Sequence, residues 1–514
     1  MRFIESRWPA AISVALLVFL MPAAAHATKH PKYGGTLRVE ISVAGVSLDP
    51  RTWKAGSVAT AENEKLAALV YDRLVTLDDY GRFLPALAAE WSHDGSFRNW
   101  QFRLRPGVKF TDGSFLTPKD VSAALQPLLP AGLQITPSEA GVVIRATRPA
   151  PDLLEQLASG RYFIYRVQPD NSFVGTGPFL LAESSPPAPS DTNPSVLRPA
   201  HMRFRANEDA WAGRPFVDAV DVLLGNPPLR QILNLQVGRA EIIDIPPDLV
   251  RKARQENLRV WNSSPHTLLA LRFDDAQPAA ADAHLREALD LALDRDTMAN
   301  VLLQRQALPS AALLPQWLSG YAFLFGATLN LDRAKELRSA LPGHFSGGAE
   351  PLRLRVDAVG DLMKLLGERV AVNARQADLS LQLVSRSASS VNASADPPGI
   401  GLHLFAWHYD SLSPRAELQS LAQHLHSEKG EEAAAEPYDP EKLFAEERRL
   451  LDDRRILPLL LLPDYVGIAA TVRNWSVAPS GEWRLADLWL DASESATSNP
   501  DASSGRSVAP GVHP

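Results

Sequence analysis

The sequence predicts an α/β fold, and three observations carry this prediction. Leu37, Val39 and Ile41 alternate with polar residues, which is the period of a half-buried strand. The segment 61–71 (AENEKLAALVY) places its apolar residues on one helix face. Strand and helix patterns then alternate along the rest of the chain, as is typical of the α/β class. With 514 residues, 45% of them hydrophobic, the chain is long enough for two or more cored domains.

The first 27 residues have the features of an export signal. Arg2 and Arg7 precede an apolar run, and Ala25-His26-Ala27 has the small-x-small form that a signal peptidase accepts, so we expect cleavage after Ala27. The run is shorter than the roughly 20 residues that span a bilayer, which favours removal over a transmembrane anchor. The sequence contains no cysteine, which excludes disulfides and a lipid anchor attached directly after the signal. These features predict a freely diffusing periplasmic protein.

The segment from Trp100 to Leu125 predicts a strand, a turn, a second strand at 108–110, another turn and a capped helix. Apolar residues alternate with polar ones on both sides of the first turn. Thr117 stands directly before Pro118, and Asp120 follows three residues after Thr117. This order predicts an N-cap hydroxyl, a proline at the first helical position and an acid near the positive helix end.

Four later segments complete the predicted organisation. The residues 285–292 predict a helix, and Asp294 is a suitable cap for a second helix after it. The apolar run 456–462 predicts a buried strand that stops at Pro463. The Pro/Ser-rich stretch 184–199 predicts a surface insertion, and the segment 493–514 predicts a disordered tail.

Charge and motif content exclude several classes of function. The net charge is −7, and removal of residues 1–27 leaves 50 basic and 58 acidic residues, or −8. Without a long basic stretch we expect no nucleic-acid partner. The chain has no serine-hydrolase elbow, no zinc-protease helix and no phosphate-binding loop, so we predict no enzyme activity and no cofactor. The odd separation of His403 and His408 places them on opposite faces of one strand, so we also predict no metal. Glycosidase chemistry stays open as a minor alternative, because two acids far apart in sequence leave no local signature.

The order of several short motifs carries a resemblance to a known family. The motifs are, in chain order, Gly34–Val39, Leu48–Pro50, Val70–Leu74, Pro85–Ala88 with Trp91, Trp100–Val121, Gly175–Phe179, Asn207 with Trp211 and Gly213–Pro215, Gly238–Glu241 with Asp244, and Arg286–Leu289 with Asp294–Arg295. In this order the chain resembles the bacterial extracellular solute-binding proteins of family 5. These are the peptide/nickel-type substrate-binding proteins of ABC transporters, which include the oligopeptide- and dipeptide-binding proteins.

The resemblance implies a two-lobed periplasmic binding protein (type II, cluster C) with an accessory domain inserted in the first lobe. The implied organisation is 1–27 signal peptide, 28–49 lobe I, 50–174 accessory domain, 175–264 lobe I, 265–479 lobe III, 480–492 lobe I and 493–514 tail. A small molecule or peptide would bind between the lobes, and the closed monomer would dock on an ABC permease in the inner membrane.

The resemblance also indicates candidate ligand-binding residues in the stretch FAWHYDSLSP. Trp407 and Asp410 match a tryptophan and an aspartate that lie in the cleft of peptide-binding members, where the aspartate pairs with the peptide ammonium group. His408 and Tyr409 lie between them and are candidates to line the pocket. The alternative is that Asp410 only initiates a turn while Trp407 lies in the core.

Two further candidates lie elsewhere in the chain. Arg272 either pairs with a ligand carboxylate or forms a plain surface bridge with Asp274 or Asp275. Ser42 begins the loop after the first strand, where backbone groups could contact a ligand. A short peptide is the favoured ligand because of Asp410. A nickel chelate, an oligosaccharide or a role as a ligand sensor stays open, since fold does not fix function.

Overall fold

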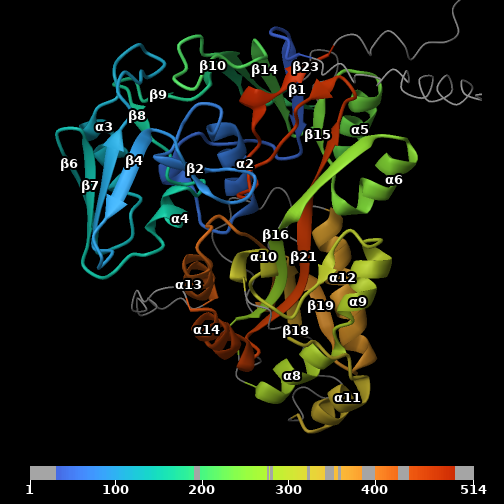
Figure 1. Ribbon diagram of the computed structural model, residues 1–514. Helices are drawn as coiled ribbons and strands as arrows, with labels where there is room; N and C mark the ends of the chain where they lie inside the picture. Colours follow the sequence, from blue (N-terminus) through green and yellow to red (C-terminus); the bar gives the residue numbers. More distant parts are fainter. Residues whose placement is uncertain are drawn as a thin grey trace, which may run out of the picture. The chain divides into compact units, whose positions relative to one another are not determined.

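A mixed sheet runs through the computed structural model, in which residues 30–189, 197–274, 277, 282–320, 325–341, 352–356, 361–384, 400–425 and 439–491 are described (Figure 1). Its strands, in spatial order, are β10 (Phe179–Ser185), β13 (Ala200–Ala206), β14 (Ala219–Leu224), β1 (Thr36–Ile41), β15 (Ile242–Asp244), β21 (Ile456–Ile468), β16 (Arg259–Phe273), β20 (Ile400–His408), β18 (Leu352–Val356) and β19 (Leu381–Val384). The short β17 (Leu308–Pro309) also pairs with β21. The predicted signal peptide, the predicted tail and the middle of the predicted insertion lie outside the described residues.

Strand β1 lies parallel to both of its neighbours, β14 and β15. Its predicted alternation is confirmed, because Leu37, Val39 and Ile41 are all at most 1% exposed. Glu40 is also buried, at 2% exposure, and Asn234 donates a hydrogen bond to its carboxylate over 2.7 Å. On the polar side of this strand Glu40 is therefore covered by the helix that carries Asn234, whereas Arg38 is exposed.

A separate four-stranded sheet lies between β1 and β10 in the sequence. Its order is β4 (Ala88–His93), β5 (Asn99–Leu104), β7 (Gly141–Ala146) and β6 (Leu133–Pro137), and α3 (Pro118–Leu125) packs against it. The predicted cap of α3 is confirmed: Thr117 and Asp120 form a reciprocal capping box. The second strand predicted at 108–110 is wrong, because only one bridge, Lys109 to Phe115, forms there.

The long strands β16 and β21 pair along nearly their whole length and join two groups of core residues. Leu457 and Leu459 pack in one core, whereas Val466 and Ile468 pack in another. We call the part built around the core of Val466 lobe I and the part built around the core of Leu457 lobe III. The predicted end of the strand at Pro463 is wrong, because Pro463 pairs with Pro265 at a register shift and the strand continues to Ile468.

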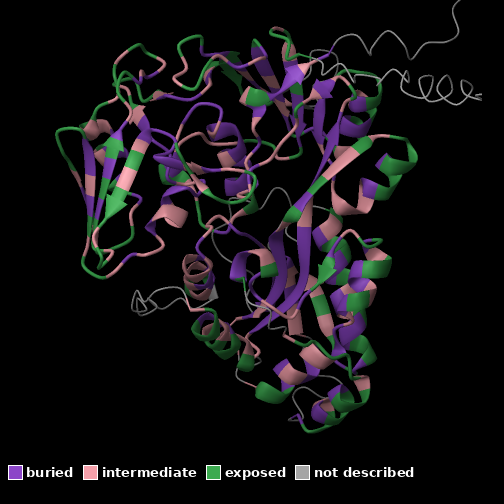
Figure 2. Ribbon diagram, viewed as in Figure 1, coloured by how far each residue is buried: buried purple, intermediate pink, exposed green. Residues whose placement is uncertain are grey.

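Helices cover both faces of the lobe III strands (Figure 1). One face carries α8 (Ala283–Ala292), α11 (Leu331–Ser339) and α12 (Asp361–Gln376); the other carries α10 (Gln316–Ser319), α13 (Pro414–Leu425) and α14 (Pro440–Asp452). The strands between them are mostly buried (Figure 2). The predicted helix at 285–292 is confirmed, and Asp294 caps the short α9 (Arg295–Thr297), which continues into the π-turn Met298–Leu302.

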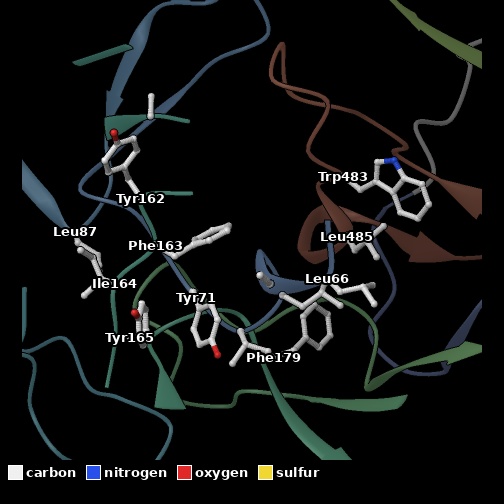
Figure 3. Packing of buried hydrophobic residues seen from close by; sticks show 14 of the residues in the cluster. Leu66, Tyr71, Leu87, Tyr162, Phe163, Ile164, Tyr165, Phe179, Trp483 and Leu485 are labelled. Atoms are coloured by element: carbon white, nitrogen blue, oxygen red, sulfur yellow. The ribbon is translucent and has the colours of Figure 1, made fainter. Parts of the chain in front are cut away.

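Helix α2 (Val58–Ala67) lies at the centre of the lobe I core, and Figure 3 shows Leu66 among the aromatic residues of that core. The helix begins and ends several residues earlier than the predicted 61–71. It ends early because the carbonyls of Leu69 and Val70 accept hydrogen bonds from Phe179 and Gly177 of a distant segment. Of its ten residues, seven are buried, so nearly every side of this helix faces protein.

The remaining elements are short. They are β2 (Val75–Leu77), β3 (Phe83–Pro85), α4 (Leu153–Leu157), β8 (Tyr165–Val167), β9 (Phe173–Gly175), β11 (Ala188–Pro189), β12 (Leu197–Arg198), α5 (Pro228–Gln236), α6 (Val250–Gln255), β22 (Val472–Arg473) and β23 (Trp489–Leu490), with single 3-10 turns at Pro50–Thr52, Pro247–Leu249 and Leu485–Asp487. The predicted domain boundaries stay a prediction. The transition of β21 between the two cores at Pro463 lies earlier in the chain than the predicted boundary at Pro479.

Candidate functional site

Asp410 lies just beyond the end of β20 and contacts a loop of lobe I. The backbone N–H of Gly56 donates to Asp410 Oδ2 over 2.6 Å, and the N–H of His408 donates to the Gly56 carbonyl over 2.8 Å. These two bonds join residues more than 350 positions apart in the chain. The end of β20 is therefore held against the loop that leads into α2.

Gly56 allows this close approach because it has no side chain. Its φ of +71° lies in the left-handed region, which favours glycine. A Cβ atom at this position would lie 2.3 Å from the ring of Trp407. Trp407 itself is only 3% exposed and packs in the lobe III core with Phe405 and Leu418.

Glu417 of α13 fixes the turn that carries Asp410. Its carboxylate accepts hydrogen bonds from Trp407 Nε1 over 3.0 Å and from the backbone N–H groups of Asp410 and Ser411, each over 2.7 Å. Burial nevertheless raises the pKa of Glu417 to about 7, because the three donors only partly offset the loss of water. This side chain sets the geometry of Asp410 while it is itself only 3% exposed.

Three carboxylates meet in this buried region: those of Asp410, Glu417 and Glu64 of α2. Burial, followed by the charges of Glu64 and Glu417, raises the pKa of Asp410 well above its usual value. Burial likewise raises the pKa of Glu64 to about 8, although Arg73 and Arg161 oppose that shift. Like charges that share a water-poor site disfavour their common ionisation. A cation placed among them would relieve this cost.

A small cavity lies beside one of these carboxylates, that of Glu64. Its enclosed volume is about 10 Å³, the size of about one water molecule, and the wider space of about 320 Å³ around it includes open solvent. Its lining consists of Ala61, Glu64, Lys65, Arg73, Gly160, His408, Asp464, Ser480, Gly481 and Glu482. These residues come from lobe I, from the end of β20 and from the part of β21 that follows Pro463, so the cavity lies where the two lobes meet.

A buried ion network forms another wall of the cavity. Lys65 is 7% exposed; its Nζ lies 2.8 Å from Glu62 Oε1 and 3.5 Å from Asp464 Oδ2. Burial opposes the lysine charge, but Asp464 and Glu62 outweigh it and raise the pKa of Lys65. Asp244 also faces this network, and burial together with the charge of Glu62 raises its pKa to about 7.

His408 is the histidine that faces the cavity. Burial lowers its pKa to about 3, so the imidazole is neutral, and its Nδ1 lies 3.3 Å from Thr267 Oγ1. His266 stacks on it with ring centroids 6.1 Å apart. Within the described ranges, no three His, Asp or Glu side chains are grouped so as to hold a metal ion.

The structure brings together only some of the residues that the sequence suggested. His408 lines the cavity, whereas Asp410 contacts Gly56, against which Trp407 packs. Tyr409 does not line the pocket, because its side chain is 2% exposed and its hydroxyl donates to the Leu313 carbonyl within lobe III. Successive residues of an extended strand point to opposite sides, which explains why His408 and Tyr409 separate.

Ser42 and Arg272 lie away from the cavity. The N–H of Ser42 donates to Asp244 Oδ2 over 3.1 Å and its hydroxyl accepts from Gln231, so both groups are already engaged. Arg272 pairs in register with His403, whereas His408 pairs with Thr267, five residues earlier on β16. At about 3.3 Å per residue, Arg272 lies roughly 16 Å further along the strand. Asp275, one of its suggested partners, lies outside the described residues.

Sequence reasoning missed several charged residues of this region, above all Glu64, Lys65 and Asp464. The sequence did show three charged residues, Glu62, Glu64 and Lys65, within one helical turn. Such a group is usually a solvated face, and only the burial of α2 on nearly every side makes it part of an interior site. Asp464 was assigned to the end of a strand that in fact continues past it.

A sheet shared by two lobes, with a polar cavity and buried charges between them, defines a binding protein that holds a small solute between its lobes. The sequence pattern of the bacterial extracellular solute-binding proteins, family 5 (middle region), matches residues 82–423, more than half of the chain. The chain therefore belongs to family 5 of the bacterial extracellular solute-binding proteins.

Characterised relatives and solved structures agree with this assignment. The chain is 22% identical over 399 residues to a nickel-binding periplasmic protein of Escherichia coli, an alignment that covers 70% of this chain and 74% of that protein. It is 25% identical over 290 residues to a probable di/tripeptide-binding protein of Pseudomonas aeruginosa, covering 50% and 55% of the two chains.

The fold is that of the two-lobed periplasmic binding proteins. The murein tripeptide-binding protein MppA of Escherichia coli superposes with a TM-score of 0.74 at 17% identity, covering 90% of this chain and 99% of that one. The oligopeptide-binding protein AppA of Bacillus subtilis, solved with a nonapeptide, gives a TM-score of 0.73 at 15% identity, covering 90% and 100%. Among the described residues, no helix combines the length and the apolar character needed to cross a membrane.

Proposed function

We propose that this solute-binding protein captures a small ligand that carries a primary ammonium group, such as a short peptide. The observation that carries the proposal is the partly buried carboxylate of Asp410, one oxygen of which is fully buried. One of its oxygens accepts from Gly56, and the other, Oδ1, is buried with no hydrogen-bond partner among the described residues. A buried carboxylate oxygen without a donor is costly, and an ammonium group is the donor that best offsets that cost.

The names of the relatives support a peptide as the ligand class. The proteins to which the chain is similar include a probable di/tripeptide-binding protein, a murein tripeptide-binding protein and an oligopeptide-binding protein solved with a nonapeptide. All free peptides have an amino-terminal ammonium group, so one acidic residue can serve many peptide sequences. Trp407, next to Gly56, supports the site by keeping water away from Asp410.

The proposal extends to export and delivery. Residues 1–27 direct the chain to the periplasm and are removed after Ala27, and the cysteine-free mature chain carries no lipid anchor. The monomeric protein then closes on its ligand and delivers it to an ABC permease in the inner membrane. It acts by reversible binding without turnover and is not an enzyme.

A library of tripeptides tests the ligand class. Mature protein is unfolded, freed of any bound molecule, refolded and incubated with an equimolar tripeptide mixture, or with the same mixture acetylated at the amino terminus. Retained peptides are identified by mass spectrometry. We expect retention of the free peptides only, and a loss of about 2–5 kcal/mol of binding free energy in Asp410→Ala, the usual cost of breaking a buried charge pair. Equal retention of both mixtures, or unchanged binding by Asp410→Ala, contradicts the proposal.

A further inference from the structure

We propose that Glu64 is a second ligand-binding carboxylate, which holds the ammonium group of the ligand jointly with Asp410. This inference rests on the proposed function, because it assigns another residue to the same site. It adds that the cation is shared between the lobes: Glu64 belongs to α2 of lobe I, whereas Asp410 follows β20 of lobe III.

The packing around Glu64 directs its carboxylate into the site. The backbone of Gly160 lies against it so closely that a Cβ atom there would lie 1.7 Å from Glu64 Oε2. Both Glu64 and Gly160 line the cavity between the lobes. Asp152, which lies before Gly160 in the chain, accepts a hydrogen bond from the Ser413 hydroxyl over 2.7 Å and so ties this region to the turn that carries Asp410.

The hydrogen-bonding state of Glu64 parallels that of Asp410. Glu64 Oε1 and Asp410 Oδ1 are both buried, and neither finds a donor in the part of the chain that the structure describes. Among the neighbouring charges, Glu64 has the largest effect on the pKa of Asp410. The charge of Glu64 therefore acts on Asp410, and each carboxylate has one buried oxygen without a hydrogen-bond partner among the described residues.

The other charges around Glu64 leave this region with an excess of acidic groups. Its neighbours are Arg73, Arg161, Glu482 and Glu417, two positive and two negative groups. Arg73 is already engaged, since it forms an ion pair with Glu482 and donates from Nε to the Ser159 carbonyl over 2.9 Å. With Asp410 added, the group holds more negative than positive charge.

These features favour a primary ammonium group over a quaternary ammonium group or an acetylated amine. A primary ammonium has three N–H donors, enough for two buried carboxylate oxygens and one further acceptor. A quaternary ammonium has no donor and would leave both oxygens without a partner. An acetylated amine has neither the charge nor the donors.

The variant Glu64→Gln tests the inference with the same free and acetylated tripeptide mixtures. It keeps the size of the side chain but removes its charge, so we expect binding of the free peptides to weaken by about 10- to 100-fold, the loss of one charge-assisted hydrogen bond. The ratio of acetylated to free peptide that the variant retains should rise. Glu155→Gln is the matched control: it changes a half-buried glutamate of α4 whose Oε2 also has no described partner but whose nearest charged neighbour is Asp152.

The outcomes separate this inference from the proposed function. If Glu64→Gln binds like the wild type while Asp410→Ala loses binding, Glu64 is not a ligand-binding residue and the proposed function stands. If the wild type retains free and acetylated peptides equally, the proposed function itself is contradicted. Thermal unfolding of Glu64→Gln and of Glu64→Asp establishes that each variant is folded. The inference would also be overturned if Glu64→Gln and the control Glu155→Gln lost binding to the same extent.

Discussion

The backbone N–H of Gly56 lies 2.6 Å from Asp410 Oδ2, and the Trp407 ring occupies the space where a side chain at position 56 would be. One glycine therefore does two things at the contact between the lobes. Its N–H donates to the Asp410 carboxylate, and its lack of a side chain lets the end of β20 approach lobe I closely.

Gly56→Ala should weaken ligand binding by about tenfold or more, because the added Cβ atom clashes with Trp407 and opposes closure of the lobes. Isothermal titration with a tripeptide retained by the wild type measures the effect. Gly81→Ala is the control, since Gly81 has a similar φ of +78° but no atom within 4 Å of its Cβ position. The control should lose about 1 kcal/mol of stability from backbone strain alone. Equal binding by both variants contradicts the role given to Gly56.

The stability of the ligand-free protein should fall as the pH rises from about 5 to 8. Burial raises the pKa of Glu64 to about 8 and that of Glu417 to about 7, above the value of about 4.3 in an unfolded chain. The folded protein therefore binds more protons than the unfolded chain in this range. The stability that Glu64 and Glu417 contribute is fully present below about pH 4.3. It is lost as the pH rises through 7 to 8.

Thermal unfolding of ligand-free protein at several pH values measures this dependence. In Glu64→Gln the side chain is always neutral, so the midpoint should fall less steeply between pH 5 and 8 than in the wild type. In Glu155→Gln the midpoint should fall with pH more steeply than in Glu64→Gln. Parallel curves for Glu64→Gln and the wild type are incompatible with a buried, proton-binding Glu64.

Lys65→Met should destabilise the protein by about 3–5 kcal/mol, because it leaves the buried carboxylate of Glu62 and the partly buried carboxylate of Asp464 without their cation. Urea denaturation measures the change. Lys252→Met removes an exposed lysine whose Nζ lies 4.0 Å from Glu256, and it should cost less than about 0.5 kcal/mol. A small effect of Lys65→Met would show that the network is open to water.

Local sequence determined much of the fold. The Thr117–Asp120 capping box and the alternation in β1 depend on neighbouring residues, and both formed as predicted. Elements set by distant contacts were harder to predict. Helix α2 ends early because the backbone carbonyls that follow it, those of Leu69 and Val70, accept hydrogen bonds from the N–H groups of Phe179 and Gly177. Strand β21 continues through Pro463 because β16 accommodates the proline at a register shift.

The candidate site was predicted only in part for the same reason. The motif around Asp410 was recognisable in the sequence, and the turn does lie at the contact between the lobes. Tyr409 was suggested by its position next to Asp410, but strand alternation turns its side chain into lobe III. Glu64 belongs to a charged helical turn that is ordinary in sequence and is unusual only because its Oε1 is buried without a described partner.

The central claim is that the protein holds a ligand with a primary ammonium group between its lobes. Native mass spectrometry of the mature protein, purified gently from a periplasm and then denatured to release its ligand, tests this claim most directly. We expect one small molecule or short peptide per protein chain, and amine-specific labelling should modify it after release. A stoichiometric ligand without a primary amine, such as a neutral oligosaccharide, would contradict the account.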